Sequence, residues 1–131
     1  MIVDTSALIA VIRNEPEAER FAELISKAER VRLSVVGYVE AGVVLDSADN
    51  PVVTRQFERL IDSSGIELEA VTPQQARLAR AAYRDFGKGT GHPAALNFGD
   101  CFSYALASET AEPLLFKGDD FARTDLKPAA V

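Results

Sequence analysis

Cysteine, histidine and basic side chains are scarce in this sequence of 131 residues, and each scarcity argues against a class of site or function. The single cysteine, Cys101, excludes an internal disulfide and fits a reducing compartment, where it is expected to be a small buried apolar residue. The single histidine, His92, argues against a histidine-rich zinc site. Fourteen basic residues against 20 acidic ones give a net charge of −6, which argues against coating nucleic acid through a broad basic surface.

Long apolar runs are missing as well. The longest are far shorter than the roughly 20 residues that a membrane-spanning helix needs. The opening residues "MIVD" lack the basic segment of a secretory leader. We therefore expect a cytoplasmic protein with no membrane anchor. A hydrophobic content of 47% and a charged content of 26% are typical of a globular chain, and residues 1–131 have the size of one domain.

Short apolar segments alternate with amphipathic helices along the chain. We expect strands at residues 1–4, 31–35, 66–71 and 113–116. Helices are expected at residues 5–12, 16–28, 37–48, 51–64, 73–86 and 97–107, the first capped by Thr5 or Ser6 and the second opened by Pro16. This alternation predicts a three-layer α/β/α domain around a mainly parallel sheet.

A few carboxylates do not fit an ordinary solvated surface. Asp4 ends the first strand, Glu40 lies in a helix with little other charge, and Asp100 lies in the first turn of an apolar helix. Asp119 follows the last strand, next to Asp120. Taken singly, each could be a turn, helix-start or exposed residue. Because the carboxyl ends of parallel strands meet at one edge of a sheet, we expect these side chains to lie together.

A cluster of carboxylates needs a cation, because like charges placed together raise one another's pKa. Oxygen ligands without histidine or cysteine favour Mg²⁺ or Mn²⁺ over zinc. A divalent ion held in this way can activate a water molecule against a phosphodiester. The carboxylates thus point to phosphodiester chemistry.

The segments around these acids resemble a known family. The segments "MIVDTSALIAVIRNEPEAERF", "SVVGYVEAGVVL", "NFGDCFSYALA" and "PLLFKGDDFARTDL" are similar to the PIN-domain ribonucleases, and most of all to the VapC-type toxins of toxin–antitoxin pairs. The resemblance covers essentially the whole chain. It implies a single PIN domain with a five-stranded parallel sheet, an acidic pocket for Mg²⁺ or Mn²⁺, and endoribonuclease activity. It also implies a homodimer that a VapB-type antitoxin inhibits within a larger complex.

The same resemblance assigns roles to individual residues. It makes Asp4, Glu40 and Asp100 catalytic acids and metal ligands, and it places a fourth acid at Asp119, with Asp120 one residue away. We expect Asp4 and Asp100 to hold the ion. Glu40 or Asp119 would orient or deprotonate the attacking water.

A few basic and hydroxyl side chains are candidates for RNA contact. Arg77, Arg80 and Arg84 form a row on one predicted helix, and a basic row on an acidic protein can steer a phosphate backbone. The alternative is a solvated helix face. Lys117 beside the acidic turn and the Ser6 hydroxyl are two further candidates, although Ser6 could also serve only as a helix cap.

Three other functions compete with the nuclease. A phosphatase of the haloacid-dehalogenase type also uses an Asp after its first strand, but "DTS" lacks the second Asp two residues after Asp4. A receiver domain has a similar layout, but "IELEAVTP" offers no phospho-accepting Asp at its strand end. A non-catalytic PIN-like module that binds a protein partner is the third alternative.

Overall fold

One parallel sheet forms the centre of the molecule. The computed structural model describes residues 1–129. Its sheet has four strands in the order β3-β2-β1-β4. The strands are β1 (Ile2–Val3), β2 (Arg32–Ser34), β3 (Glu67–Glu69) and β4 (Leu114–Leu115). All pairings are parallel, so the carboxyl ends of the strands share one edge of the sheet.

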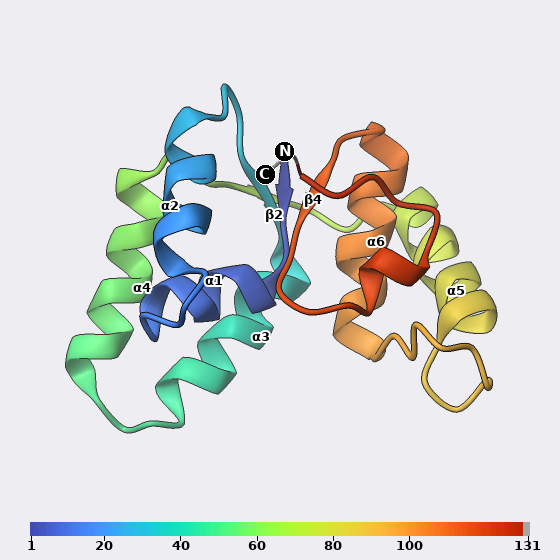
Figure 1. The fold of residues 1–131 in the computed structure, drawn as a ribbon, viewed down its shortest axis with the longest axis horizontal. Helices are drawn as coiled ribbons and strands as arrows, with labels where there is room; N and C mark the ends of the chain where they lie inside the picture. The colour runs from blue at the N-terminus through green and yellow to red at the C-terminus, as the bar shows by residue number, and fades with distance from the viewer. Residues whose placement is uncertain (130–131) are drawn as a thin grey trace.

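Helices cover both faces of the sheet, which confirms the predicted three layers (Figure 1). Figure 1 shows α1, α2 and α4 on one side of the strands and α5 and α6 on the other. The helices are α1 (Thr5–Ile12), α2 (Ala18–Lys27), α3 (Val35–Asp46), α4 (Pro51–Ser63), α5 (Pro73–Phe86) and α6 (Phe98–Thr110), followed by the short 3₁₀ helix η1 (Phe121–Arg123).

Each face of the sheet has its own hydrophobic core. Val3 and Leu115 pack with α1 to α4, whereas their neighbours Ile2 and Leu114 pack with α5 and α6. Successive residues of a strand point to opposite faces, so two-residue strands contribute to both cores. Cys101 is buried in the second core, as predicted, and burial raises the pKa of its thiol to about 11.

The resemblance implied five strands, and the described residues form four. Next to β4, the chain forms only a single parallel bridge, between Leu114 and Pro128. The backbone N–H of Leu114 donates to Lys127 at 3.0 Å, and that of Ala129 donates to Leu114 at 2.8 Å. Proline has no N–H to donate to a ladder, which limits the pairing here to one residue pair.

Some helix boundaries also differ from the expected ones. The first helix is capped by Asp4, not by Thr5 or Ser6, because the Asp4 side chain accepts a hydrogen bond from the Ser6 backbone. The second begins at Ala18, after a turn that contains Pro16. The third begins at Val35, directly after β2, with Ser34 as its cap. Within residues 1–129, no helix combines the length and apolar character needed to cross a bilayer.

Candidate functional site

Asp4 lies where β1 passes into α1, and its carboxylate is held from both sides. One oxygen, Oδ2, accepts from the Ser6 backbone N–H at 2.9 Å and from the Ser6 hydroxyl at 2.6 Å. The other, Oδ1, accepts from the Ser103 hydroxyl at 2.6 Å. The residue is only 3% exposed. Capping α1 and anchoring on α6 therefore give this carboxylate a fixed direction at the edge of the sheet.

Ser103 is a site residue that the sequence did not reveal. It lies three residues after Asp100 on α6, on the same face of that helix, and it is buried. The signal available was a hydroxyl on an otherwise apolar helix face. α6 thus brings both Asp100 and a hydrogen-bond donor toward Asp4.

Asp100 lies in the first turn of α6 and forms a capping box with Asn97. The Asn97 backbone N–H donates to Asp100 Oδ2 at 2.9 Å, and the Asp100 N–H donates to the Asn97 side chain at 2.8 Å. Burial raises the pKa of the Asp100 carboxyl to about 7, and the negative charges of Asp4, Glu40 and Asp120 add to the rise, whereas the Asn97 hydrogen bond opposes it. The capping box therefore fixes the position of Asp100 without compensating its charge.

Glu40 extends from α3 toward the site of Asp4 and Asp100. Burial raises the pKa of its carboxyl, and the charge of Asp4 raises it further. Gly99 makes this position accessible, because a Cβ built on Gly99 would overlap the Glu40 carboxylate. Sequence reasoning also missed Gly99, whose absent side chain leaves room for an acid from another helix. The structure thus brings together Asp4, Glu40 and Asp100 from three different elements.

The turn after β4 carries Asp119 and Asp120, the two candidates for the fourth acid. Asp119 and Asp120 are both exposed, and Asp120 is among the charges that raise the pKa of Asp100, whereas Asp119 is not. The Lys117 backbone N–H donates to the Ser6 hydroxyl at 3.0 Å, which fastens this turn to Asp4 through Ser6. Gly118 has a φ of +97°, a conformation that favours glycine. The assignment of Asp119 remains a prediction, with Asp120 the stronger candidate from the charges.

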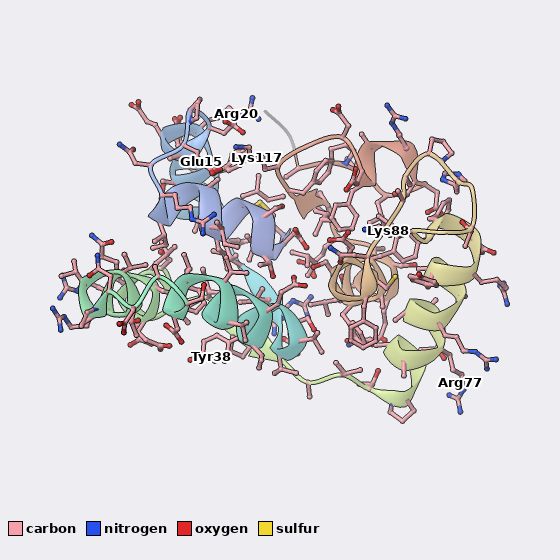
Figure 2. The ribbon with its side chains drawn as sticks, turned by 90° about the horizontal axis from the view of Figure 1, so that it is seen from below. Glu15, Arg20, Tyr38, Arg77, Lys88 and Lys117 are labelled. Carbon is pink, nitrogen blue, oxygen red and sulfur yellow. The ribbon has the colours of Figure 1, made fainter. Side chains whose placement is uncertain are left out.

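The predicted basic residues differ in whether their charge is already paired with acidic side chains. The Lys117 ammonium pairs with Glu15 at 2.7 Å and Glu17 at 3.4 Å, and Figure 2 shows it beside Glu15. Arg80 and Arg84 are exposed on α5 and line a cavity between α5 and α6. Figure 2 shows Arg77, on the same helix, pointing outward. The arginines stay candidates for RNA contact, while the ammonium of Lys117 is occupied by acids of the α1–α2 region.

The acids suit a hard cation chemically. Within residues 1–129, no three His, Cys, Asp or Glu side chains already form a group that could hold one ion. Mg²⁺ does not need such a group, because it usually keeps several waters and binds one or two carboxylates. The donors offered are carboxylate oxygens, and burial, together with the smaller effect of their mutual repulsion, raises the pKa of Asp100 and Glu40. A bound cation would reverse that effect, so the donor set fits Mg²⁺ or Mn²⁺.

The raised pKa of Asp100 predicts that the metal-free protein loses stability as pH rises. Between about pH 4 and 7 the folded chain keeps a proton that the unfolded chain releases, so the free energy of unfolding falls across this window. The full loss is on the order of 2–4 kcal/mol. Urea unfolding in a chelator at several pH values measures it.

Asp100→Asn should remove most of this pH dependence, because the amide cannot ionise and still accepts from Asn97. Asp119→Asn, at an exposed position, is the matched control and should follow the wild type. An Asp100→Asn variant with the wild-type slope would contradict the assigned cause.

Comparison with known proteins gives this geometry a context. Residues 1–127 match the PIN domain family. Ribonuclease VapC28 of Mycobacterium tuberculosis (strain ATCC 25618 / H37Rv) is 54% identical over 129 residues, which cover 98% of this chain and 97% of the relative. Ribonuclease VapC30 of the same strain is 45% identical over 132 residues and covers 100% of this chain and 99% of its own.

Solved structures show the same fold. The crystal structure of Mycobacterium tuberculosis VapC20, described as a Sarcin-Ricin loop cleaving toxin, superposes with a TM-score of 0.74 at 19% identity and covers 95% of each chain. FitAcB from Neisseria gonorrhoeae gives a TM-score of 0.68 at 16% identity and covers 98% of this chain and 96% of its own. The extent of the family match and the identity to full-length relatives show that this chain belongs to the PIN-domain family and, within it, to the VapC ribonucleases.

Proposed function

We propose that this protein is a metal-dependent endoribonuclease and the toxin of a toxin–antitoxin pair. The observation that carries the proposal is the meeting of Asp4, Glu40 and Asp100, which come from three elements and act electrostatically on one another in a partly buried site. Relatives named ribonucleases, at 45–54% identity over nearly the whole chain, support it. The proposal includes a cytoplasmic location, where such an enzyme would meet RNA.

Asp4 and Asp100 would hold Mg²⁺ or Mn²⁺, and such an ion supplies charge stabilisation at the scissile phosphate and acidifies water. Ser6 and Ser103 hold the Asp4 carboxylate in place. Glu40, whose carboxyl pKa is raised by burial and by the charge of Asp4, would take a proton from the attacking water. Asp119 or Asp120 would orient that water from the turn after β4.

The proposed partners are a VapB-type antitoxin and a second copy of the chain. Structural neighbours include a toxin–antitoxin complex from Klebsiella pneumoniae, with a TM-score of 0.68 at 19% identity. On α3, Val39 and Val43 are 60% and 66% exposed and lie one turn apart, which makes this face a candidate for the homodimer contact. Binding of the antitoxin to such a homodimer would form the larger complex.

Cleavage of labelled RNA by the purified chain tests the proposal directly. Strand scission should require added Mg²⁺ or Mn²⁺, stop on addition of EDTA and return with excess metal. Mapping the cleaved ends separates endonucleolytic cutting from trimming. Cleavage that EDTA leaves unchanged would contradict the metal role. Failure to cut any RNA, together with tight binding of a protein partner, would favour the non-catalytic module.

A further inference from the structure

The chain that follows the turn after β4 folds back onto α6 (Figure 1). Phe121, the first residue of η1, is 3% exposed and packs in the second core together with Tyr104 of α6. Its ring also lies beside that of Phe116, with centroids 5.3 Å apart. The exposed turn with the two candidate acids is therefore followed directly by a buried anchor.

Hydrogen bonds join residues 120–126 into a single unit. The backbone N–H of Arg123 donates to the Asp120 carbonyl at 3.3 Å. The N–H and the hydroxyl of Thr124 both donate to the carbonyl of the first residue of η1, at 3.0 and 2.6 Å. The same hydroxyl accepts from the Leu126 N–H at 3.3 Å. A restraint near the end of this unit therefore also acts on Asp120 at its start.

Tyr104 of α6 supplies such a restraint. Its hydroxyl donates to Asp125 Oδ1 at 2.6 Å, and the tyrosine is only 8% exposed. Its ring lies beside that of Phe86, with centroids 5.6 Å apart. Burial and the hydrogen bond to Asp125 raise the pKa of Tyr104, so the hydroxyl keeps its proton at neutral pH and remains a donor. The tyrosine is thus a fixed point to which residues 120–126 are attached.

The same helix carries Asp100. Asp100 and Tyr104 are four residues apart on α6 and therefore lie on one face of it, with Ser103 beside them. The start of the turn after β4 is held separately, because the Lys117 backbone N–H donates to the Ser6 hydroxyl at 3.0 Å. The turn is thus attached at its start to α1 and, through the unit that follows it, to the helix of Asp100.

The two attachments beyond the turn have different effects. Burial of Phe121 holds the chain against the core but has no direction, whereas the hydrogen bond of Tyr104 to Asp125 depends on distance and angle. The hydrogen bond therefore restricts rotation of the unit about the buried ring. Asp120 directly precedes that ring, and its charge acts on Asp100. Rotation of the unit would change the distance between these two acids.

We propose that Tyr104 and Asp125 are positioning residues of the acidic site, whose hydrogen bond sets the place of the Asp120 carboxylate relative to Asp100. The inference rests on the proposed ribonuclease function and adds to it two residues that touch neither metal nor substrate. The device depends on geometry and not on charge, because a carboxylate or an amide at position 125 can accept from the tyrosine hydroxyl.

Single-turnover cleavage of labelled RNA in Mg²⁺ tests the inference. Tyr104→Phe should lower the maximal rate about tenfold and leave the protein concentration at half-maximal rate unchanged, because a misplaced group slows the reaction without weakening substrate binding. Asp125→Ala should have the same effect, whereas Asp125→Asn keeps an acceptor oxygen and should cut at the wild-type rate. These variants should fold, since Tyr104→Phe keeps the buried ring and Asp125 is exposed.

Coupling to Asp120 separates positioning from a merely structural role. The double variant Tyr104→Phe with Asp120→Asn should be no slower than Asp120→Asn alone, because both changes act through one carboxylate. A further tenfold loss in the double variant would overturn the inference. Tyr38→Phe is the matched control, because it removes a hydroxyl that donates to another carboxylate, Glu58 on α4, at 2.5 Å. This control should cut RNA like the wild type.

Amide hydrogen exchange gives a readout that does not require cleavage. Exchange at Arg123 and Thr124, whose N–H groups donate within the unit, should be about tenfold faster in Tyr104→Phe than in the wild type. Wild-type exchange at these amides, or wild-type cleavage by Tyr104→Phe, would overturn the inference. Absence of cleavage by the unmodified chain would overturn the proposed function, while faster exchange in Tyr104→Phe would still support the restraint on the turn.

Discussion

Asn in place of Asp4 or Asp100 should lower the rate of RNA cleavage by about a thousandfold or more, because each change would remove one of the two proposed charged ligands of the metal ion. Both substitutions keep the shape of the side chain. Asn at position 4 can still accept from the Ser6 backbone, and Asn at position 100 can still accept from Asn97. Single-turnover cleavage of labelled RNA in Mg²⁺ measures the loss, with circular dichroism to verify folding.

Asp62→Asn is the matched control for this experiment. It removes one carboxylate from an exposed position on α4 and should leave cleavage unchanged. Asp119→Asn and Asp120→Asn belong to the same series, and we expect the larger loss from Asp120→Asn because its charge acts on Asp100. An Asp4→Asn or Asp100→Asn chain that cuts RNA at the wild-type rate would refute the assignment of the acids.

A single methyl group at Gly99 should disable the site without touching a charge. The Cβ of Gly99→Ala would occupy the space of the Glu40 carboxylate, which lies at the end of a flexible side chain and can swing away. The fold should therefore survive, while Glu40 leaves the other acids. If Glu40 is the general base proposed above, its displacement predicts a fall in cleavage of about a hundredfold.

Gly42→Ala offers the matched comparison, since it adds the same methyl group to a helix where the new Cβ would meet only Asp46, at 3.8 Å. Alanine should stabilise that helix by up to about 1 kcal/mol and leave cleavage unchanged. The double variant Gly99→Ala with Glu40→Gln should be no slower than Glu40→Gln alone, because both changes remove the same interaction. Equal activity of Gly99→Ala and Gly42→Ala would show that Glu40 acts elsewhere.

The sequence predicted the meeting of the acids better than it predicted their supports. The convergence of residues at the carboxyl ends of parallel strands accounts directly for Asp4, and for Glu40 one turn into the helix that follows its strand. Asp100 lies in the first turn of a helix with no strand directly before it, so it was assigned to the site from the family resemblance. Ser103 could not be recognised, because a serine on a buried helix face is not distinguished by spacing from one that only fills space. Gly99 could not be recognised either, because its role depends on the side chain of Glu40, 59 positions earlier in the chain.

The fold was predicted at the level of layers and elements, with errors at the boundaries. α3 begins two residues before the expected Gly37 because β2 passes directly into it with no loop. Asp4 as the cap of α1 was missed because Thr5 and Ser6 are equally good capping residues by type. The choice between Asp119 and Asp120 depends on the path of an exposed turn through Gly118, which no periodicity encodes.

The acidic site depends on both hydrophobic cores, which lie on opposite faces of the sheet. Glu40 is carried by a helix packed in the first core, and Asp100 by a helix packed in the second. Opening of either half would separate the carboxylates, so neither half of the molecule alone can assemble the acidic cluster. A nascent or partly digested chain in which only one of the two cores is packed would therefore lack the complete acidic cluster on which the proposed hydrolysis depends.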